Sequence, residues 1–506
     1  MESTTFFKSK SGKQYLYDNN NSMFLLVHPV IKYFYQLEKK GMNIEDIIDN
    51  LKEENNIKDI GIYSRSEIEY YFFKYKFLKE NNFFTLVKKH QRVLPNITPD
   101  SIRYYTANIK QILFEVTESC NLNCAYCTYN ELFYESYNRK NTNLSIESAK
   151  SIIDYFEKIW NSKLNMNEEQ NVIISFYGGE PLLNIKFINE LIDYISAKKS
   201  LKKNVSYSIT TNGILLKKYI DLLVINDFMV TVSLDGNYKN NQYRVDHNNK
   251  NPHKQIVNDL KEIMKKYPEF YENNISFNTV LHDKNSVESV LNFFGNELNK
   301  TTKIMEINTD GVKSERKEDL MKMLNNISLS YSDAASKGLN VDTDDWDLAP
   351  NNQMLTLLRG LWSNYLRTYG DLFHSKVEQE RPITGTCSPF WKRMFITSKG
   401  FILPCERIDY KYYLGKVEEN AVLLDFDEIA KKYNNYYRNI YGQCNRCYMS
   451  RSCLQCMFYV DNIETKPVCN EFLDKKGFSQ YLSNIYSLME TEPAKIFSLL
   501  EKTIYE

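Results

Sequence analysis

The sequence has no excess of charge of either sign and no long apolar run. Its 506 residues carry 64 Lys and Arg against 64 Asp and Glu. Nucleic acids and anionic membranes select for a basic surface, so this balance gives no reason to expect either partner. The apolar runs, such as Met23–Val27, are far shorter than the roughly 20 residues that span a bilayer. The N-terminus also lacks the apolar core of a signal peptide. We therefore expect a cytoplasmic protein.

Hydrophobic residues make up 42% of the chain, which excludes disordered and collagen-like classes. Ten cysteines are an ordinary number for this length, but their positions are clustered. Three lie within Cys120–Cys127, and the other seven lie within Cys387–Cys469. In a reducing compartment, clustered thiols favour metal binding or redox chemistry over disulfides.

From residue 111 onward, apolar runs typical of strands alternate with segments of helical periodicity. The expected strands are 112–116, 172–177, 205–210, 229–234, 275–280 and 304–307. The expected helices are 145–160, 183–198, 217–227, 253–266 and 286–298. This alternation predicts an α/β fold, a partial (β/α)6 TIM-like barrel of parallel strands with its site at their carboxyl ends.

The first hundred residues have a different pattern. Lys13–Asp18 and Ser22–Val27 flank three asparagines like a hairpin, and helical segments are expected at 29–41, 43–55 and 66–81. This predicts a small winged-helix-like module. After residue 310 the pattern becomes irregular and helical (317–329 and 354–369). The expected boundaries are 1–94 for the module, 108–310 for the barrel, 311–386 for a helical bridge, 387–475 for a cysteine-rich domain and 476–506 for a helical tail.

The first cysteine group has the spacing C-x3-C-x2-C at Cys120, Cys124 and Cys127, just after the first expected barrel strand. Three thiolates can ligate three irons of a cubane cluster and leave the fourth iron open. A structural zinc site, which would want a fourth ligand nearby, is the alternative for these residue types.

This triple, with the aromatic Tyr126 before its last cysteine, resembles the signature of the radical S-adenosylmethionine (radical SAM) superfamily. The resemblance implies a cluster whose open iron chelates the methionine part of S-adenosyl-L-methionine. It also implies reductive cleavage of that cofactor to a 5′-deoxyadenosyl radical.

Three further motifs end the next expected strands and are similar to cofactor-binding positions of the family. The resemblance implies that a glycine-rich turn and a carboxylate bind the cofactor's ammonium group, and that later positions contact its ribose or carboxylate. Each motif taken alone is an ordinary turn. A lone arginine after them is either a partner of the cofactor carboxylate or a surface residue. The implied residues are Gly178, Gly179, Glu180, Thr211, Asn212, Ser233 and Arg244.

The seven later cysteines resemble the SPASM extension of peptide- and protein-modifying family members. The resemblance implies one auxiliary cluster on Cys444, Cys447, Cys453 and Cys469, and another on Cys387, Cys405 and Cys456. The spacing before Cys456 is two residues where three are usual, which weakens the assignment of that ligand. Zinc is the alternative for paired C-x2-C units.

Together the resemblances imply three 4Fe–4S clusters, one of which binds S-adenosyl-L-methionine. Seven cysteines are one fewer than two cubanes fully ligated by cysteine require. One auxiliary iron therefore needs another ligand, unless one cluster is smaller or absent.

The residue after Cys405 narrows the choice within the family. Sulfatase-maturing relatives place an aspartate there as a catalytic base, whereas Glu406-Arg407 is similar to maturases of cysteine-rich ribosomal peptides. Glu406 is thus a candidate base, and a surface ion pair with Arg407 is the alternative.

The N-terminal module looks like the leader-recognition domain fused to peptide-modifying enzymes, in which an edge strand pairs with an extended leader. We expect an anaerobic enzyme that forms a thioether, from cysteine sulfur to carbon, in a ribosomal precursor peptide with a leader. An external flavodoxin- or ferredoxin-type reductant would supply electrons. The alternatives are a formylglycine-generating maturase and, from another class, a zinc-stabilised peptide- or DNA-binding protein.

Overall fold

The computed structural model describes residues 2–21, 23–86, 94–133, 140–166, 171–201, 203–309, 311–339, 383–450, 453–491 and 493. The chain divides into two compact units. The first consists of residues 1–95, 342–386 and 436–506, and the second of residues 96–341 and 387–435. The domain boundaries expected from the sequence stay predictions.

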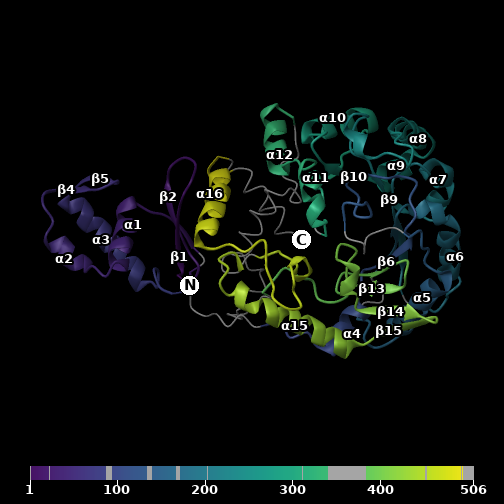
Figure 1. The fold of residues 1–506 in the computed structure, drawn as a ribbon, viewed down its shortest axis with the longest axis horizontal. Helices are drawn as coiled ribbons and strands as arrows, with labels where there is room; N and C mark the ends of the chain where they lie inside the picture. Colours follow the sequence, from purple (N-terminus) through teal and green to yellow (C-terminus); the bar gives the residue numbers. More distant parts are fainter. Residues whose placement is uncertain are drawn as a thin grey trace. The chain divides into compact units, whose positions relative to one another are not determined.

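The second unit is built on parallel strands that pair in chain order. All six expected strands and all five expected helices are present, so the α/β fold is confirmed. The strands are β6 (Gln111–Thr117), β7 (Val172–Gly178), β8 (Val205–Thr211), β9 (Met229–Ser233), β10 (Ile275–Leu281) and β11 (Lys303–Glu306). The helices, which flank the outer side of the strands in Figure 1, are α5 (Ile146–Trp160), α6 (Ile185–Ser196), α7 (Leu216–Ile225), α8 (His253–Lys266) and α10 (Val287–Leu298).

These elements form because the apolar spacing gives each of them a buried face. On α5, residues Ile152, Ile153, Phe156 and Trp160 are buried three and four positions apart, the spacing of one helical face. Ser145 caps the helix by accepting a hydrogen bond from a first-turn N–H. Burying each large apolar side chain contributes roughly 1.5–3 kcal/mol, so the outer helices are stabilised mainly by packing on the sheet.

The sheet continues beyond the six expected strands. β12 (Arg393–Ile396) lies parallel to β6, with Arg393 opposite Gln111 and Ile396 opposite Phe114. β13 (Phe401–Leu403), β14 (Gly415–Glu418) and β15 (Ala421–Leu424) follow as antiparallel neighbours. The first part of the cysteine-rich region is therefore hydrogen-bonded to the first barrel strand.

The N-terminal part of the first unit contains a three-stranded antiparallel sheet, β1 (Thr4–Lys8), β2 (Gln14–Asp18) and β3 (Met23–Leu26). The expected hairpin corresponds to β2 and β3, and β1 was not predicted. The helices are α1 (Pro29–Lys39), α2 (Ile44–Asp49) and α3 (Arg65–Glu80). The helix expected over 43–55 ends earlier, because β4 (Glu54–Ile57) forms a hairpin with β5 (Gly61–Ser64).

The remaining described helices include α4 (Pro99–Ala107), α9 (Pro268–Asn274), α11 (Lys317–Met321), α12 (Ile327–Ser336), α15 (Phe426–Cys444) and α16 (Lys475–Thr491). The helix expected over 317–329 is two helices, and α15 was not predicted. The helix expected over 354–369 lies outside the described residues. α16 packs Phe478 and Leu482 against Phe7 and Tyr15 of the small sheet. Within the described part of the chain, every helix is too short or too polar to cross a membrane.

Candidate functional site

The sequence motifs lie where four neighbouring strands end. The loop Cys120–Cys127 follows β6, Gly178 ends β7, Thr211 ends β8 and Ser233 ends β9. Because these strands are parallel and adjacent, their carboxyl ends share one edge of the sheet. The structure thus gathers at one edge the segments that the sequence analysis assigned to one site.

The Gly178–Gly179 turn holds the beginning of the cysteine loop. Gly178 has a φ of +136°, and a Cβ on it would lie 2.2 Å from the carbonyl oxygen of Thr117. A Cβ on Gly179 would lie 2.1 Å from the carbonyl oxygen of Ser119. The N–H of Gly179 donates to Thr117, and the N–H of Glu180 donates to Ser119, both at 2.8 Å. Only glycine permits this close contact between the two backbones.

The carboxylate of Glu180 joins the ends of β7 and β8. It is fully buried and accepts hydrogen bonds from Thr211 Oγ1 at 2.7 Å, the N–H of Asn212 at 2.7 Å and the N–H of Leu182 at 3.1 Å. Burial raises its pKa to about 7, against the opposing effect of these hydrogen bonds. The Nδ2 of Asn212 lies 3.7 Å from Cys120 Sγ. Glu180 therefore helps to place Asn212 beside the first cysteine.

A hydrogen-bond donor lies beside Cys120, and a cation acts on Cys124. Cys120 Sγ accepts a hydrogen bond from the N–H of Leu122 at 3.4 Å. Burial raises the pKa of Cys124 to about 12, while the positive charge of Arg244 opposes that shift. A buried thiol with such a pKa loses its proton when a metal binds it, and nearby donors and cations stabilise the ligand form.

Tyr126, within the cysteine loop, and Arg244 belong to one buried network. The hydroxyl of Tyr126 donates to Asp235 Oδ2 and accepts a hydrogen bond from Arg244 Nη1 at 3.0 Å. His282 Nε2 lies 3.6 Å from the same carboxylate oxygen. Arg244 is 7% exposed, so it is not a surface residue. Among the described residues nothing accepts a hydrogen bond from its buried Nε, which leaves a donor for an anionic group.

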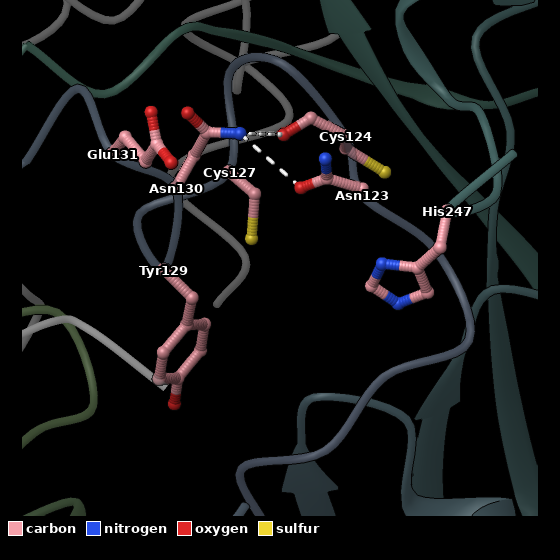
Figure 2. A pocket seen from close by; sticks show the side chains of 7 residues that line it. All are labelled: Asn123, Cys124, Cys127, Tyr129, Asn130, Glu131 and His247. Carbon is pink, nitrogen blue, oxygen red and sulfur yellow. Dashed lines mark hydrogen bonds between the residues drawn. The ribbon is translucent and has the colours of Figure 1, made fainter. Parts of the chain in front are cut away.

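A cavity of about 330 Å³ lies beside Cys124 and Cys127. Figure 2 shows the sulfur of Cys127 and the rings of Tyr129 and His247 around one open space. His247 Nε2 is 2.9 Å from the carbonyl oxygen of Cys120, so the histidine lies against the cysteine loop. No histidine was expected in the site, because the spacing of the histidines in the sequence matches no metal-binding pattern. The cavity is lined by Asn123, Cys124, Cys127, Tyr129, Asn130, Glu131 and His247.

A buried carboxylate next to this cavity was not expected from the sequence. Glu115, on β6, binds the hydroxyls of Tyr129 and Tyr410. Tyr410 belongs to a short 3-10 helix, Tyr410–Tyr412, in the region after β13. One signal was present in the sequence: strands of a buried parallel sheet are nearly continuous apolar runs, so a glutamate within one is an anomaly.

Glu406 is held by an arginine that the sequence analysis did not consider. Arg393 Nη1 donates to Glu406 Oε1 at 2.6 Å, and the side chain of Glu406 is 14% exposed. Burial alone would raise the pKa of Glu406, but the charge and hydrogen bond of Arg393 hold it below its usual value. Arg407, the partner expected from the sequence, is farther away at 3.8 Å. The thiol of Cys405 lies 3.5 Å from Glu406 Oε2, and burial raises the pKa of that thiol to about 12.

The later cysteines fall in both units. In the second unit, burial opposes a rise in the pKa of Arg393, but Glu406 raises it, and the nearby Cys405 and Cys387 add to the rise. In the first unit, burial raises the pKa of Cys469, and the nearby Cys453 and Cys447 add to the shift. Cys447, Cys453 and Cys469 are three of the four residues expected to share a cluster.

The donor set at the strand ends fits an iron–sulfur cluster. It consists of three thiols on one loop, N–H donors to Cys120 and an unpaired buried guanidinium nitrogen near Cys124. Within the described residues, no three His, Cys, Asp or Glu side chains converge on a point for a single metal ion. The fit therefore rests on the chemistry around the thiols.

Residues 114–294 match the family model described as the radical SAM superfamily. The cyclopropyl synthase TigE of Paramaledivibacter caminithermalis, a radical SAM protein, is 25% identical over 76% of this chain and 75% of its own length. A cysteine-type anaerobic sulfatase-maturating enzyme of Clostridium novyi is 29% identical over 32% of this chain. An uncharacterised protein of Methanocaldococcus jannaschii is 34% identical over 25% of this chain. The matches span 41% and 39% of the lengths of these last two relatives.

Solved structures share the fold. The structure described as native anSMEcpe with bound AdoMet and Kp18Cys peptide aligns with a TM-score of 0.51 and 18% identity. The alignment covers 78% of this chain and 99% of that chain. At this identity the likeness concerns the fold alone.

Proposed function

We propose that this chain, which belongs to the radical SAM superfamily of enzymes, modifies a ribosomally made precursor peptide. The modification joins a cysteine sulfur to a carbon. The observation that carries the proposal is the loop Cys120–Cys127, held at the strand ends beside a cavity. Cys120, Cys124 and Cys127 would hold a reduced cluster, at which bound S-adenosyl-L-methionine would supply a 5′-deoxyadenosyl radical for removal of a hydrogen atom from carbon. The residues of this chain bind the cofactors, orient the peptide and exclude water.

Ten cysteines would hold three 4Fe–4S clusters in the sets expected from the sequence. Cys120, Cys124 and Cys127 hold the cluster that binds S-adenosyl-L-methionine. One auxiliary cluster takes Cys444, Cys447, Cys453 and Cys469, and the other takes Cys387, Cys405 and Cys456. Gly178, Gly179, Glu180, Thr211, Asn212, Ser233, Tyr126 and Arg244 support the cofactor site, and an external flavodoxin- or ferredoxin-type protein is the reductant.

Glu406 stays a candidate proton acceptor near the auxiliary cluster of Cys405. Its ion pair with Arg393 favours the carboxylate form, which accepts protons only weakly at neutral pH. Replacing Glu406 with Gln tests the assignment through the yield of crosslinked peptide.

The small N-terminal sheet is the proposed leader-binding surface, and its two edges differ. Ser479, Ser483 and Ser487, at four-residue spacing on α16, bind backbone groups on the outer edge of β1 and of Lys10 just after it. Ser479 Oγ donates to the carbonyl of Phe6 at 2.9 Å, and Ser487 Oγ accepts from the N–H of Lys10 at 2.7 Å. Backbone groups on that edge are thus already satisfied. In the described part of the chain no strand pairs with the outer edge of β3, so an extended leader would add there.

Synthetic leader peptides test this pairing with the full-length protein. Backbone groups of an added strand point alternately toward and away from its neighbour. N-methylation at every second position should therefore weaken binding, measured by fluorescence anisotropy, whereas methylation at the intervening positions should not. Equal effects at all positions would contradict strand addition, and preferential binding of duplex DNA would favour the winged-helix alternative.

Coexpression with short cysteine-rich open reading frames, read by mass spectrometry, tests the product. A thioether predicts loss of two hydrogens together with a cysteine that no longer reacts with alkylating agents. The likeness to TigE over three quarters of both chains supports a second candidate, ring closure between carbons. That product would keep an alkylatable cysteine or form in a precursor without one. Conversion of cysteine to formylglycine would instead remove the sulfur.

A further inference from the structure

Glu115 is a fully buried carboxylate on a strand that is otherwise apolar between Gln111 and Thr117. Its Oε1 accepts a hydrogen bond from Tyr410 Oη at 2.8 Å and another from Tyr129 Oη. Its Oε2 accepts one from the N–H of Ser398 at 2.8 Å. Because Tyr129 also lines the cavity beside Cys127, this tyrosine connects the cavity to the buried carboxylate.

Glu115 Oε1, Tyr129 Oη and Tyr410 Oη can accept one additional proton without any movement of the oxygen atoms. Tyr129 Oη and Tyr410 Oη are 3.1 Å apart, and both lie within hydrogen-bonding reach of Glu115 Oε1. When Glu115 is ionised, both hydroxyls donate to Oε1. When it is protonated, Oε1 donates to Tyr129, Tyr129 donates to Tyr410, and Tyr410 donates back to Oε1. Every polar atom stays paired in both states, so only hydroxyl hydrogens need to rotate.

The electrostatic surroundings suit a proton acceptor. Burial raises the pKa of Glu115, and the three hydrogen bonds offset part of the shift. The charge of Glu118, itself paired with Lys399 at 3.0 Å, adds to the rise, and the hydroxyl of Tyr177 also interacts with Glu115. A carboxylate whose pKa is raised binds a proton more readily than an exposed carboxylate does. Glu406, in contrast, is committed to Arg393.

We propose that Glu115 takes up the proton that leaves the peptide during bond formation, with Tyr129 as the relay from the cavity. The proposal rests on the proposed function. Joining carbon to sulfur, or to a second carbon, removes two hydrogens: one leaves as an atom to the deoxyadenosyl radical and the other as a proton, while one electron passes to an auxiliary iron–sulfur cluster. The S–H or C–H bond breaks with its electron pair left on sulfur or carbon. Tyr129 Oη receives the proton and passes its own to Glu115 Oε1.

The ratio of crosslinked peptide to 5′-deoxyadenosine tests the relay. Glu115→Gln should continue to form 5′-deoxyadenosine, while crosslink per 5′-deoxyadenosine falls at least about tenfold, since removing a general base typically costs 10²–10⁴-fold. Glu115→Asp should recover part of the ratio. Tyr271→Phe is the matched control, because Tyr271, on α9, does not line the cavity and has a buried hydroxyl that donates to the carbonyl oxygen of Leu298 at 2.7 Å. An unchanged ratio in Glu115→Gln would overturn the proposal.

A second readout needs neither cofactor nor peptide. Infrared difference spectra of wild type against Glu115→Gln should show a carboxylic acid band that persists to higher pH than for exposed glutamates and then disappears. A band already lost at the pH of exposed glutamates would overturn the proposal. If the band titrates as expected but no precursor is crosslinked, the proposed function fails and the proton-binding site stands. If Glu115→Gln does not fold, Tyr410→Phe should lower the crosslink ratio, and no change there would overturn the relay.

Discussion

Replacing Gly179 with alanine tests how the cysteine loop is held. The new Cβ would lie 2.1 Å from the carbonyl oxygen of Ser119, 2.5 Å from its carbonyl carbon and 2.7 Å from the carbonyl oxygen of Glu118. All three are backbone atoms, so the turn and the loop must separate. Separation breaks the hydrogen bonds from Gly179 to Thr117 and from Glu180 to Ser119, worth about 1 kcal/mol each. Steric crowding by the new Cβ adds roughly 1–3 kcal/mol, so the free energy of unfolding should fall by about 3–5 kcal/mol.

The assay is urea unfolding together with the iron content after anaerobic reconstitution. Gly295→Ala is the matched control, because Gly295 lies in α10 of the same unit and a Cβ there meets nothing within 4 Å. Alanine in that helix should be neutral or stabilise by up to about 1 kcal/mol. Gly179→Ala should lower the unfolding midpoint and the iron bound. If both variants unfold alike and bind iron alike, the close backbone contact does not hold the loop.

Three further predictions concern the cofactor sites. Replacing Cys120, Cys124 and Cys127 together with alanine should abolish 5′-deoxyadenosine formation and leave the iron of the later cysteines in place, as read by iron analysis. The folded-state pKa of Glu180, about 7, lies above the usual 4.5, so protonated Glu180 favours the folded state. This stabilisation is complete below pH 4.5 and is lost as the pH rises through 7. In urea unfolding, the free energy of unfolding of Glu180→Gln relative to that of wild type should therefore rise by about 3 kcal/mol between pH 4.5 and 7.5. A cysteine-containing precursor should change the electron paramagnetic resonance signal of the Cys387, Cys405 and Cys456 cluster if its thiolate fills the missing ligand position. A serine precursor should not, and identical spectra would argue against ligation.

The barrel could be predicted because its signals are local. Each strand and outer helix carries its own apolar period, and parallel strands joined by helices leave few alternatives for their order. The C-x3-C-x2-C spacing is equally local, so its place after β6 followed directly. The same reasoning failed for α2, where Glu54 and Asn55 continue a polar stretch that periodicity cannot assign and tertiary pairing makes a strand.

Side-chain partners could not be predicted, because they come from segments distant in sequence. For Glu406 the sequence offered an ion pair with its neighbour Arg407 as the alternative to a role as base, and the structure has that contact at 3.8 Å. The shorter contact, from Arg393 across the β12–β13 hairpin, was not expected. Arg244 was expected either to pair with the cofactor carboxylate or to be a surface residue, and its burial depends on Tyr126 and Asp235. Sequence spacing identifies which residue types are present, whereas charge neutralisation depends on contacts that the sheet creates.

Because β12 pairs with β6, the sheet joins the cysteine loop to the residues that hold the proposed proton acceptor, Glu115. β6 leads into the cysteine loop, and Glu115 lies on the same strand. Because β12 lies parallel to β6, the chain leaving β12 places the N–H of Ser398 on Glu115, and the region after β13 supplies Tyr410. The proton-binding group thus depends on residues 283 and 295 positions away in the chain. A change in the segment after β12 could therefore alter proton uptake without touching the loop that carries Cys120.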